Sequence, residues 1–320
     1  MKLRAAPTVV GTAVVLLLSG CGAGDSGAEG DEGATTGSAT AGDQVVLALD
    51  DFAALHALTL GVEPDTVYEV FDYEATSEIF DDLGLETRPY GSELDVEAVA
   101  ALEPDVILGV SIPTTVTVED QLRAIAPTTV LDYTAGWEEQ LDTAAAALGR
   151  EDDAERVRGR VTEHTDELAG ELRDAGLTDT VVSVVGDNGG FFSPPTTTAL
   201  GSALESVGLA RPPAQQQAGD AASPFVVFGA EALADHDGEH LFLLSGGPYR
   251  TEGLTGSPLW PGLQAVAAGT VAEVSGEMWL APSAFSVVWI LDDLRAVLLE
   301  QGAAAAAADA PARLAEFLDV

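Results

Sequence analysis

A tyrosine and an arginine follow a glycine turn late in the chain, and their chemistry suits a binding site for a small organic ligand. Tyr249 and Arg250 come directly after Gly246-Gly247-Pro248. The arginine presents a planar fork of N–H donors, and the tyrosine presents a flat ring with one hydroxyl. Other aromatic and basic side chains stand near the ends of predicted strands, where α/β proteins collect their ligands. The candidate ligand-binding residues are Phe52, Arg88, Tyr90, Phe191, Phe192, Tyr249, Arg250 and Trp279.

Residue types that hydrolyse substrates are present, but not in a catalytic pattern. Asp50, Asp51 and Asp187 are available acids, and Ser193 or Ser245 is a nominal nucleophile. The sequence has no Gly-x-Ser-x-Gly elbow and no HExxH or clustered His/Asp motif. A secreted hydrolase is therefore the weaker alternative. The pattern predicts a binding protein rather than an enzyme, with no cofactor or metal ligands of its own.

Two glutamates occupy matching positions in the two halves of the chain. Glu97 lies near the start of a predicted short helix before the buried run at 106–108, and Glu231 lies near the start of another before the run at 241–243. A single acid at a helix N-terminus usually compensates the helix dipole. A matched pair, one in each half, instead indicates an external contact that both halves share.

Apolar β-branched runs alternate with helical stretches from residue 45 onward, which predicts an α/β fold with two Rossmann-like lobes. Strand signals are absent from residues 138–148 and 152–175. The second of these stretches has one apolar face, and 24 residues of helix make a rod of roughly 36 Å. We therefore predict two lobes joined by one long α-helix. The apolar face consists of Ala154, Val157, Val161, Leu168 and Leu172.

The N-terminal segment predicts export and anchoring. A basic start precedes an apolar run, 9–18, that is too short to span a bilayer. Leu18-Ser19-Gly20-Cys21 resembles the bacterial lipobox, in which the cysteine becomes the lipidated N-terminus of the mature protein, and this lone cysteine has no partner for an internal disulfide. The predicted boundaries are 1–20 for the signal peptide, 21–43 for a lipid-anchored flexible stalk, 44–135 for the N-terminal lobe, 136–176 for the linking helical segment and 177–320 for the C-terminal lobe.

The charge of the chain restricts its partners. The formal net charge is -40, and cleavage of the signal segment removes Lys2 and Arg4, which takes it from -40 to -42. Nucleic acid and anionic lipid headgroups need a basic face and are excluded as favoured partners. The lipid on Cys21 is then the predicted membrane anchor, which places the protein on the outer side of the cell membrane.

Four segments resemble the iron-siderophore and vitamin B12 substrate-binding proteins of bacterial ABC importers. The helix–strand segment Glu93 to Leu108 is similar to that family's signature, and the likeness runs in order from residue 45 to 300. The resemblance implies two lobes bridged by a rigid helix, a ligand cleft between them and modest closure on binding. It also implies that Glu97 and Glu231 dock onto arginines of the membrane permease, with the protein acting as a monomer. The other three segments are 121–130, 201–212 and 257–279.

The same resemblance, together with the charges of the predicted cleft, indicates the class of ligand. Family members that bind triply charged catecholate chelates commonly show a cluster of Arg or Lys in the cleft, whereas the mature part of this chain has no lysine, and only Arg88 and Arg250 stand in plausible cleft loops. We therefore expect a neutral or cationic ferric hydroxamate, held by contacts to the outer surface of the chelate. Vitamin B12 is the nearest alternative. Haem is another, and His56 is the histidine that could reach a cleft to bind its iron.

Overall fold

The computed structural model describes residues 44–71, 73–217 and 225–319, all of which belong to one compact unit, Ala39–Val320. The predicted signal peptide, Cys21 and the stalk lie outside the described residues, so the export and lipidation signals remain predictions. Within the described ranges, no helix is both long and apolar enough to cross a membrane.

The first lobe is built on a five-stranded parallel sheet with the order β3-β2-β1-β4-β5. Alternate side chains of the first strand enter two different cores, because successive residues of a strand face opposite sides of the sheet. Val46 packs in the larger core with α1 and α5, and Leu47 packs in a smaller core with residues of α3 and α4. The strands are β1 (Val46–Ala48), β2 (Thr66–Glu69), β3 (Glu86–Pro89), β4 (Val106–Val110) and β5 (Thr128–Leu131), and the helices are α1 (Asp51–Thr59), α2 (Glu74–Leu83), α3 (Val96–Ala100), α4 (Pro113–Arg123) and α5 (Trp137–Leu148).

The second lobe has a mixed sheet with the order β10-β9-β6-β7-β8. Its first three strands are parallel, whereas β7 and β8 run antiparallel to their neighbours. The strands are β6 (Val182–Asp187), β7 (Phe191–Ser193), β8 (Val226–Phe228), β9 (His240–Ser245) and β10 (Val271–Ser275). The helices are α7 (Ala199–Ser206), η1 (Pro213–Gln215), η2 (Ala230–His236), α8 (Glu252–Thr255), η3 (Trp260–Gly262), α9 (Gln264–Ala268), α10 (Gly276–Leu280), α11 (Ala284–Leu298), η4 (Ala307–Asp309) and α12 (Ala310–Leu318).

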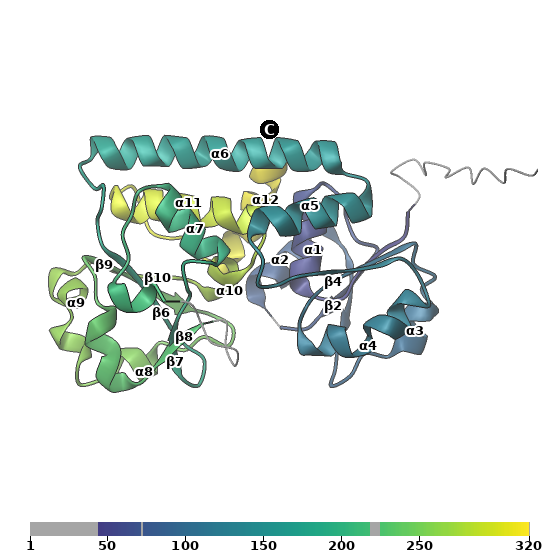
Figure 1. The fold of residues 1–320 in the computed structure, drawn as a ribbon, viewed down its shortest axis with the longest axis horizontal. Coiled ribbons are helices and arrows are strands. Elements are labelled where there is room, and N and C mark those ends of the chain that lie inside the picture. The colour runs from purple at the N-terminus through teal and green to yellow at the C-terminus, as the bar shows by residue number, and fades with distance from the viewer. Residues whose placement is uncertain (1–43, 72, 218–224, 320) are drawn as a thin grey trace, which may run out of the picture. The chain divides into compact units, whose positions relative to one another are not determined.

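A long helix, α6 (Glu151–Asp174), connects the two lobes and runs alongside α5 of the first and α7 and α11 of the second (Figure 1). The residues that α6 buries are the apolar face predicted from the sequence, Ala154, Val157, Val161, Leu168 and Leu172. Arg295 of α11 also bonds Glu171 of α6 at 2.8 Å. The predicted fold class, two α/β lobes joined by one long helix, is confirmed.

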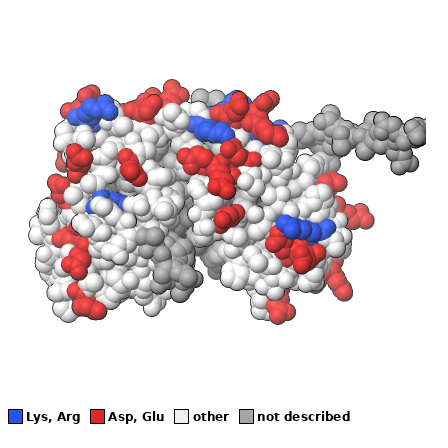
Figure 2. All heavy atoms as spheres, viewed as in Figure 1, with Lys and Arg blue, Asp and Glu red and all other residues white. Residues whose placement is uncertain are grey.

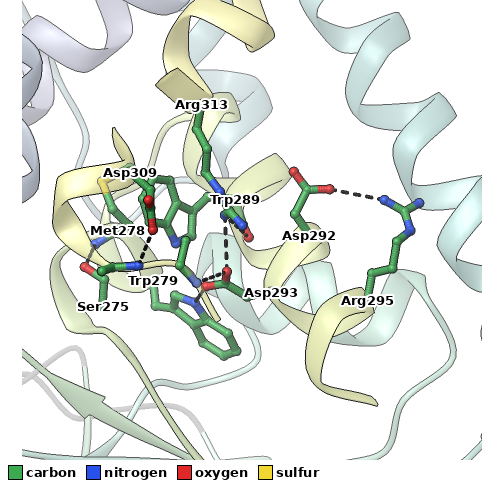
Figure 3. A network of polar contacts seen from close by, with 11 residues as sticks. Ser275, Met278, Trp279, Trp289, Asp292, Asp293, Arg295, Asp309 and Arg313 are labelled. Carbon is green, nitrogen blue, oxygen red and sulfur yellow. Dashed lines mark hydrogen bonds and ion pairs between the residues drawn. The ribbon is translucent and has the colours of Figure 1, made fainter. Parts of the chain in front are cut away.

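The C-terminal helices α12 and η4 pack against α2 of the first lobe. Asp293 of α11, which is fully buried, fixes this C-terminal segment (Figure 3). Its carboxylate accepts hydrogen bonds from Trp279 Nε1 at 2.8 Å and from the backbone N–H of Ala305 at 2.9 Å, and it pairs with Arg313 at 3.2 Å. The segment 177–320, predicted as the second lobe, therefore also covers part of the first.

Candidate ligand-binding cleft

Four aromatic rings gather where strands of the first lobe end. Phe52 is the second residue of α1, after β1, Phe71 and Tyr73 follow β2, and Tyr133 follows β5. The ring centroid of Phe52 lies 4.9 Å from that of Phe71, 5.8 Å from that of Tyr73 and 5.8 Å from that of Tyr133. Carboxyl ends of parallel strands meet at one edge of a sheet, so residues distant in sequence form one aromatic wall here.

Two buried aspartates hold the loops that carry this wall. Asp50 caps α1 by accepting from Ala53 N–H at 2.8 Å, and its other oxygen accepts from Val110 N–H at 2.8 Å. Burial raises the pKa of Asp50 to about 7, against the opposing effect of these backbone donors. Asp51 accepts from the N–H groups of Val70 and Phe71, and burial raises its pKa too. Both acids therefore position the loops.

The second lobe supplies a facing group of rings. Phe192 lies on β7, its centroid 4.9 Å from that of Phe225 and 6.0 Å from that of Tyr249. Tyr249 follows the turn at Gly246 and Gly247, both of which have positive φ. A β-carbon on Gly247 would lie 2.8 Å from the carboxylate of Glu277, so this turn requires glycine at the close approach as well as at the backbone angle.

Two sets of polar contacts join the lobes beside these rings. The hydroxyls of Tyr73 and Tyr249 lie 3.3 Å apart. The carboxylate of Glu277 accepts from the backbone N–H groups of Glu74, at 3.1 Å, and Ala75, at 2.8 Å. A C-terminal-lobe acid thus caps α2, a helix of the N-terminal lobe, and is itself only 2% exposed. We call these contacts the Glu277 latch, formed by Tyr73, Glu74, Ala75, Tyr249 and Glu277.

A pocket opens next to the aromatic groups and is lined by both lobes. The first lobe contributes Tyr133, Thr134 and Ala135. The second lobe contributes Pro195, Thr197, Thr198, Ala199, Leu200, Phe225, Trp279, Leu280 and Pro282. Its cavity volume is about 50 Å³. Pockets for drug-sized ligands are on the order of 300–1,000 Å³. The structure therefore shows a nearly closed cleft, and a bulky ligand can enter only if the lobes separate.

The lining of the cleft contains no basic side chain among the residues that the structure describes. Burial raises the pKa of Tyr73 and of Tyr133, so both remain neutral hydroxyls. Burial also raises the pKa of Glu277. Acidic side chains outnumber basic ones on the face of the molecule shown in Figure 2. The described lining of this pocket is thus aromatic and apolar, with Glu277 nearby and no basic side chain.

The structure brings together some of the predicted ligand-binding residues and not others. Phe52, Phe192 and Tyr249 belong to the two aromatic groups. Trp279 lines the pocket but is fully buried against Phe242. Arg250 is exposed after the Tyr249 turn.

The remaining three predicted residues lie outside these aromatic groups. Arg88 of β3 pairs with Glu86 at 2.6 Å on the surface. Tyr90 packs edge-on against Tyr68 in the core on the α3–α4 face of the first sheet. Phe191 points to Phe228, with a centroid separation of 6.0 Å, and packs on a separate core of the second lobe.

Sequence reasoning missed Phe71, Tyr73, Tyr133, Phe225 and Glu277. The first three stand in the loops that follow β2 and β5, so the rule that selected Phe52 also applied to them. Glu277 carried no such signal, because only the approach of the two lobes brings it to α2.

His56, the histidine considered for haem, is fully buried. Its Nε2 lies 3.2 Å from Gln140 Oε1, and burial lowers the pKa of the imidazole to about 4. It is therefore not available to bind haem iron in the cleft.

The two matched glutamates are exposed at equivalent places in the two lobes. Glu97 is the second residue of α3, and Glu231 is the second residue of η2. Each therefore presents a carboxylate at the surface near a helix start. No group of three or more His, Cys, Asp or Glu side chains in the described ranges is arranged to hold a metal ion.

Comparison with known proteins places the chain among binding proteins. Residues 39–277 match the family described as "Periplasmic binding protein". The "Probable siderophore-binding lipoprotein YfiY" of Bacillus subtilis is 29% identical over 237 residues, which cover 68% of this chain and 69% of the relative. The "Ferric enterobactin-binding periplasmic protein FepB" of Escherichia coli is 29% identical over 224 residues, or 66% of this chain and 69% of that protein.

A solved structure shares the fold. The siderophore periplasmic binding protein from the fuscachelin gene cluster of Thermobifida fusca is 28% identical, with a TM-score of 0.64, and the match covers 80% of this chain and 97% of that one. These relatives are solute-binding proteins and not enzymes, so the expectation of a binding protein is confirmed.

Proposed function

The chain belongs to the periplasmic binding protein family, and on that basis we propose that it captures a ferric siderophore outside the cytoplasm and delivers it to an ABC importer. The names of the relatives support a siderophore as ligand and an extracytoplasmic location. The observation that carries the proposal is the cleft itself, in which aromatic groups from both lobes face one another beside a pocket that both lobes line.

The charge of the cleft favours a hydroxamate siderophore. Ferric hydroxamates are neutral or cationic, and aromatic faces attract cationic groups. A triply charged catecholate complex would instead be desolvated near Asp51 and Glu277, with no basic side chain in the described pocket lining. FepB shows that this family also includes a ferric enterobactin binder, so the selectivity depends on cleft residues and not on the fold.

In this proposal the chelate fills the iron shell, and the protein contacts only its outer surface. Phe52, Phe192 and Tyr249 form the walls, together with Phe71, Tyr73, Tyr133 and Phe225, which the structure adds. Exposed Arg250 follows Tyr249 in the chain, and in this proposal its guanidinium donates to an oxygen of the ligand. Separation of the Glu277 latch opens the cleft to the ligand, because the cavity of about 50 Å³ that remains with the latch formed is too small for a ferric siderophore.

Delivery requires a surface that the permease recognises. We assign this role to Glu97 and Glu231, one exposed acid on each lobe, as electrostatic contacts to arginines of the permease. Charge reversal at both positions should reduce iron uptake by cells at least about tenfold, because complementary charge controls encounter and register. Ligand affinity of the purified variant should stay unchanged. Full uptake by the double variant would exclude this docking surface.

Retention at the membrane is assigned to lipid on Cys21, with the stalk giving reach to a monomeric protein. YfiY is named a lipoprotein, which supports this assignment. Cys21→Ser should release the protein into the medium or periplasm while leaving ligand affinity intact. Retention of the variant in the membrane fraction would contradict the assignment.

Titration of tryptophan fluorescence tests the ligand class, and Trp279 on the pocket lining supplies a reporter. Ferrioxamine B should quench with a Kd at or below about 1 µM, whereas ferric enterobactin should bind at least about 100-fold more weakly. Tight binding of ferric enterobactin without binding of ferrioxamine B would overturn the charge argument. Binding of cyanocobalamin alone would overturn the siderophore proposal.

A further inference from the structure

Arg211 is a buried cation without an acidic partner among the residues that the structure describes. The residue lies between α7 and η1 and is 6% exposed. Its Nη1 donates to the carbonyl of Pro194 at 2.6 Å, and its Nη2 donates to Ser193 Oγ at 2.9 Å and Gln215 Oε1 at 2.7 Å. Its Nε has no hydrogen-bond partner within the described part of the chain. The acceptors around this guanidinium are all neutral oxygens.

Arg211 differs from the ion-paired arginines in both burial and charge compensation. Ion-paired arginines in the described ranges lie at the surface or partly exposed, with side-chain exposures between 20% and 70%. Arg211 is more buried than any of these, and no carboxylate of the described residues neutralises it. Burial of an uncompensated charge costs free energy that a nearby anion would recover. The chain has 53 acidic residues, so the absence of a partner among the described ones does not reflect a lack of acids in the sequence.

A separate cavity reaches this arginine from the surface. It has a volume of about 350 Å³, and Arg211 lies on its wall with Thr196, Gly201, Glu205 and Gln216. None of these residues lines the pocket between the lobes. We propose that this cavity binds a small anionic molecule that carries a phosphate or carboxylate group, with Arg211 as its counter-ion. The proposal does not depend on what occupies the cleft.

The cavity shares one chain segment with the cleft. Arg211 bonds Ser193 and Pro194, and the residues that follow them alternate between the two sites. Pro195, Thr197 and Thr198 line the cleft pocket, whereas Thr196 lines the Arg211 cavity. Gly201 allows this segment to lie against α7, because a β-carbon there would overlap the backbone of Thr196. An anion bound at Arg211 would therefore sit directly behind one wall of the cleft.

Desolvation lowers the pKa of Arg211 to about 10, which still leaves it charged at neutral pH. Exposed Glu205 is the one acid on the described lining, and its charge opposes an anion at the mouth of the cavity. This opposition supplies a test that does not disturb the buried network, since Glu205→Gln removes a surface charge only.

Isothermal titration calorimetry of the full chain, at constant ionic strength, provides the test with inorganic phosphate and citrate as probes. At least one probe should bind saturably, and Arg211→Gln should weaken that binding at least about tenfold. Glu205→Gln should tighten it about two- to fivefold, whereas Glu63→Gln, an exposed acid of the other lobe, should not.

Three results would overturn the proposal. The first is that neither probe approaches saturation at about 10 mM, the order of magnitude of physiological solutes. The second is that folded Arg211→Gln binds the probe as well as the wild type does. The third is an equal gain from Glu205→Gln and Glu63→Gln, which would reflect net charge and not a site. If Arg211→Gln does not fold, the comparison of the two glutamate variants decides.

Discussion

The two lobes present aromatic walls to the same cleft, but they hold those walls in different ways. In the N-terminal lobe the rings follow parallel strands, and Asp50 and Asp51 fix the loops from within the lobe. In the C-terminal lobe the rings come from antiparallel β7, the residue before β8 and a glycine turn, next to Glu277, whose carboxylate bonds the other lobe. The first wall is therefore preorganised, whereas part of the support of the second depends on closure.

This comparison predicts which substitutions affect stability and which affect binding. Changes to buried acids within a lobe remove acceptors that the fold needs whether or not a ligand is bound. Changes to the Glu277 latch remove contacts that exist only when the lobes approach. Stability and ligand affinity should thus separate in the variants below.

The largest stability loss is expected for Asp293→Ala, which leaves Arg313, Trp279 Nε1 and Ala305 N–H without their shared acceptor. Removal of one partner of a buried pair costs roughly 3–5 kcal/mol. Urea unfolding measures this loss. Asp292→Ala, at the partly exposed neighbouring position, is the control and should cost below about 1 kcal/mol. Equal losses at both positions would show that Asp293 does not fix the C-terminal segment.

The pH dependence of the free energy of unfolding should reveal the raised pKa of Asp50. Its pKa is about 7 in the folded protein and 3.8 for the ordinary side chain, so the folded state binds the extra proton between these values. The free energy of unfolding should therefore fall as pH rises from about 4 to about 7, by up to about 1.4 kcal/mol per pH unit from this group. Asp50→Asn should flatten this part of the profile, as measured by urea unfolding at several pH values. An unchanged profile would refute the raised pKa.

The latch should affect affinity more than stability. Glu277→Ala removes two charge-assisted hydrogen bonds across the lobes, so the closed form, whose cavity of about 50 Å³ is too small for the chelate, becomes less populated and ferrioxamine B should bind about 10-fold or more tightly. Glu277→Gln keeps one acceptor and should tighten the binding of ferrioxamine B by a smaller factor. Exposed Glu273→Gln on β10 controls for the change in net charge. Fluorescence titration compares the three, and wild-type affinity of Glu277→Ala would exclude the latch.

The smallest effect is expected for Tyr249→Phe, which removes the hydroxyl contact to Tyr73 and keeps the ring in the wall. The affinity for ferrioxamine B should rise about two- to tenfold, because the closed form that excludes the chelate loses one contact. Tyr68→Phe, in the core on the α3–α4 face of the first sheet, should leave it unchanged. A complete loss of binding in Tyr249→Phe would mean that the hydroxyl contacts the ligand instead of the other lobe.

How much the sequence revealed depended on how local each signal was. The long helix was evident because its apolar face repeats within α6 itself, and buried β4 was evident as one apolar run. Strand β3 could not be recognised from the sequence, because Glu86–Pro89 is a partly exposed edge strand that contains a proline and no apolar run. The aromatic wall was only partly predicted, since it assembles from residues up to 81 positions apart, from Phe52 to Tyr133. Glu277 meets α2 only through the packing of two lobes, which no local pattern encodes.

The most direct test of the account is the position of iron in a crystal of the protein with ferrioxamine B, determined from anomalous scattering at the iron edge. We expect one iron peak between the lobes, with Phe52 and Tyr133 on one side and Phe192, Phe225 and Tyr249 on the other. An iron peak on the outer surface of either lobe, with the cleft still closed around its own side chains, would contradict the account.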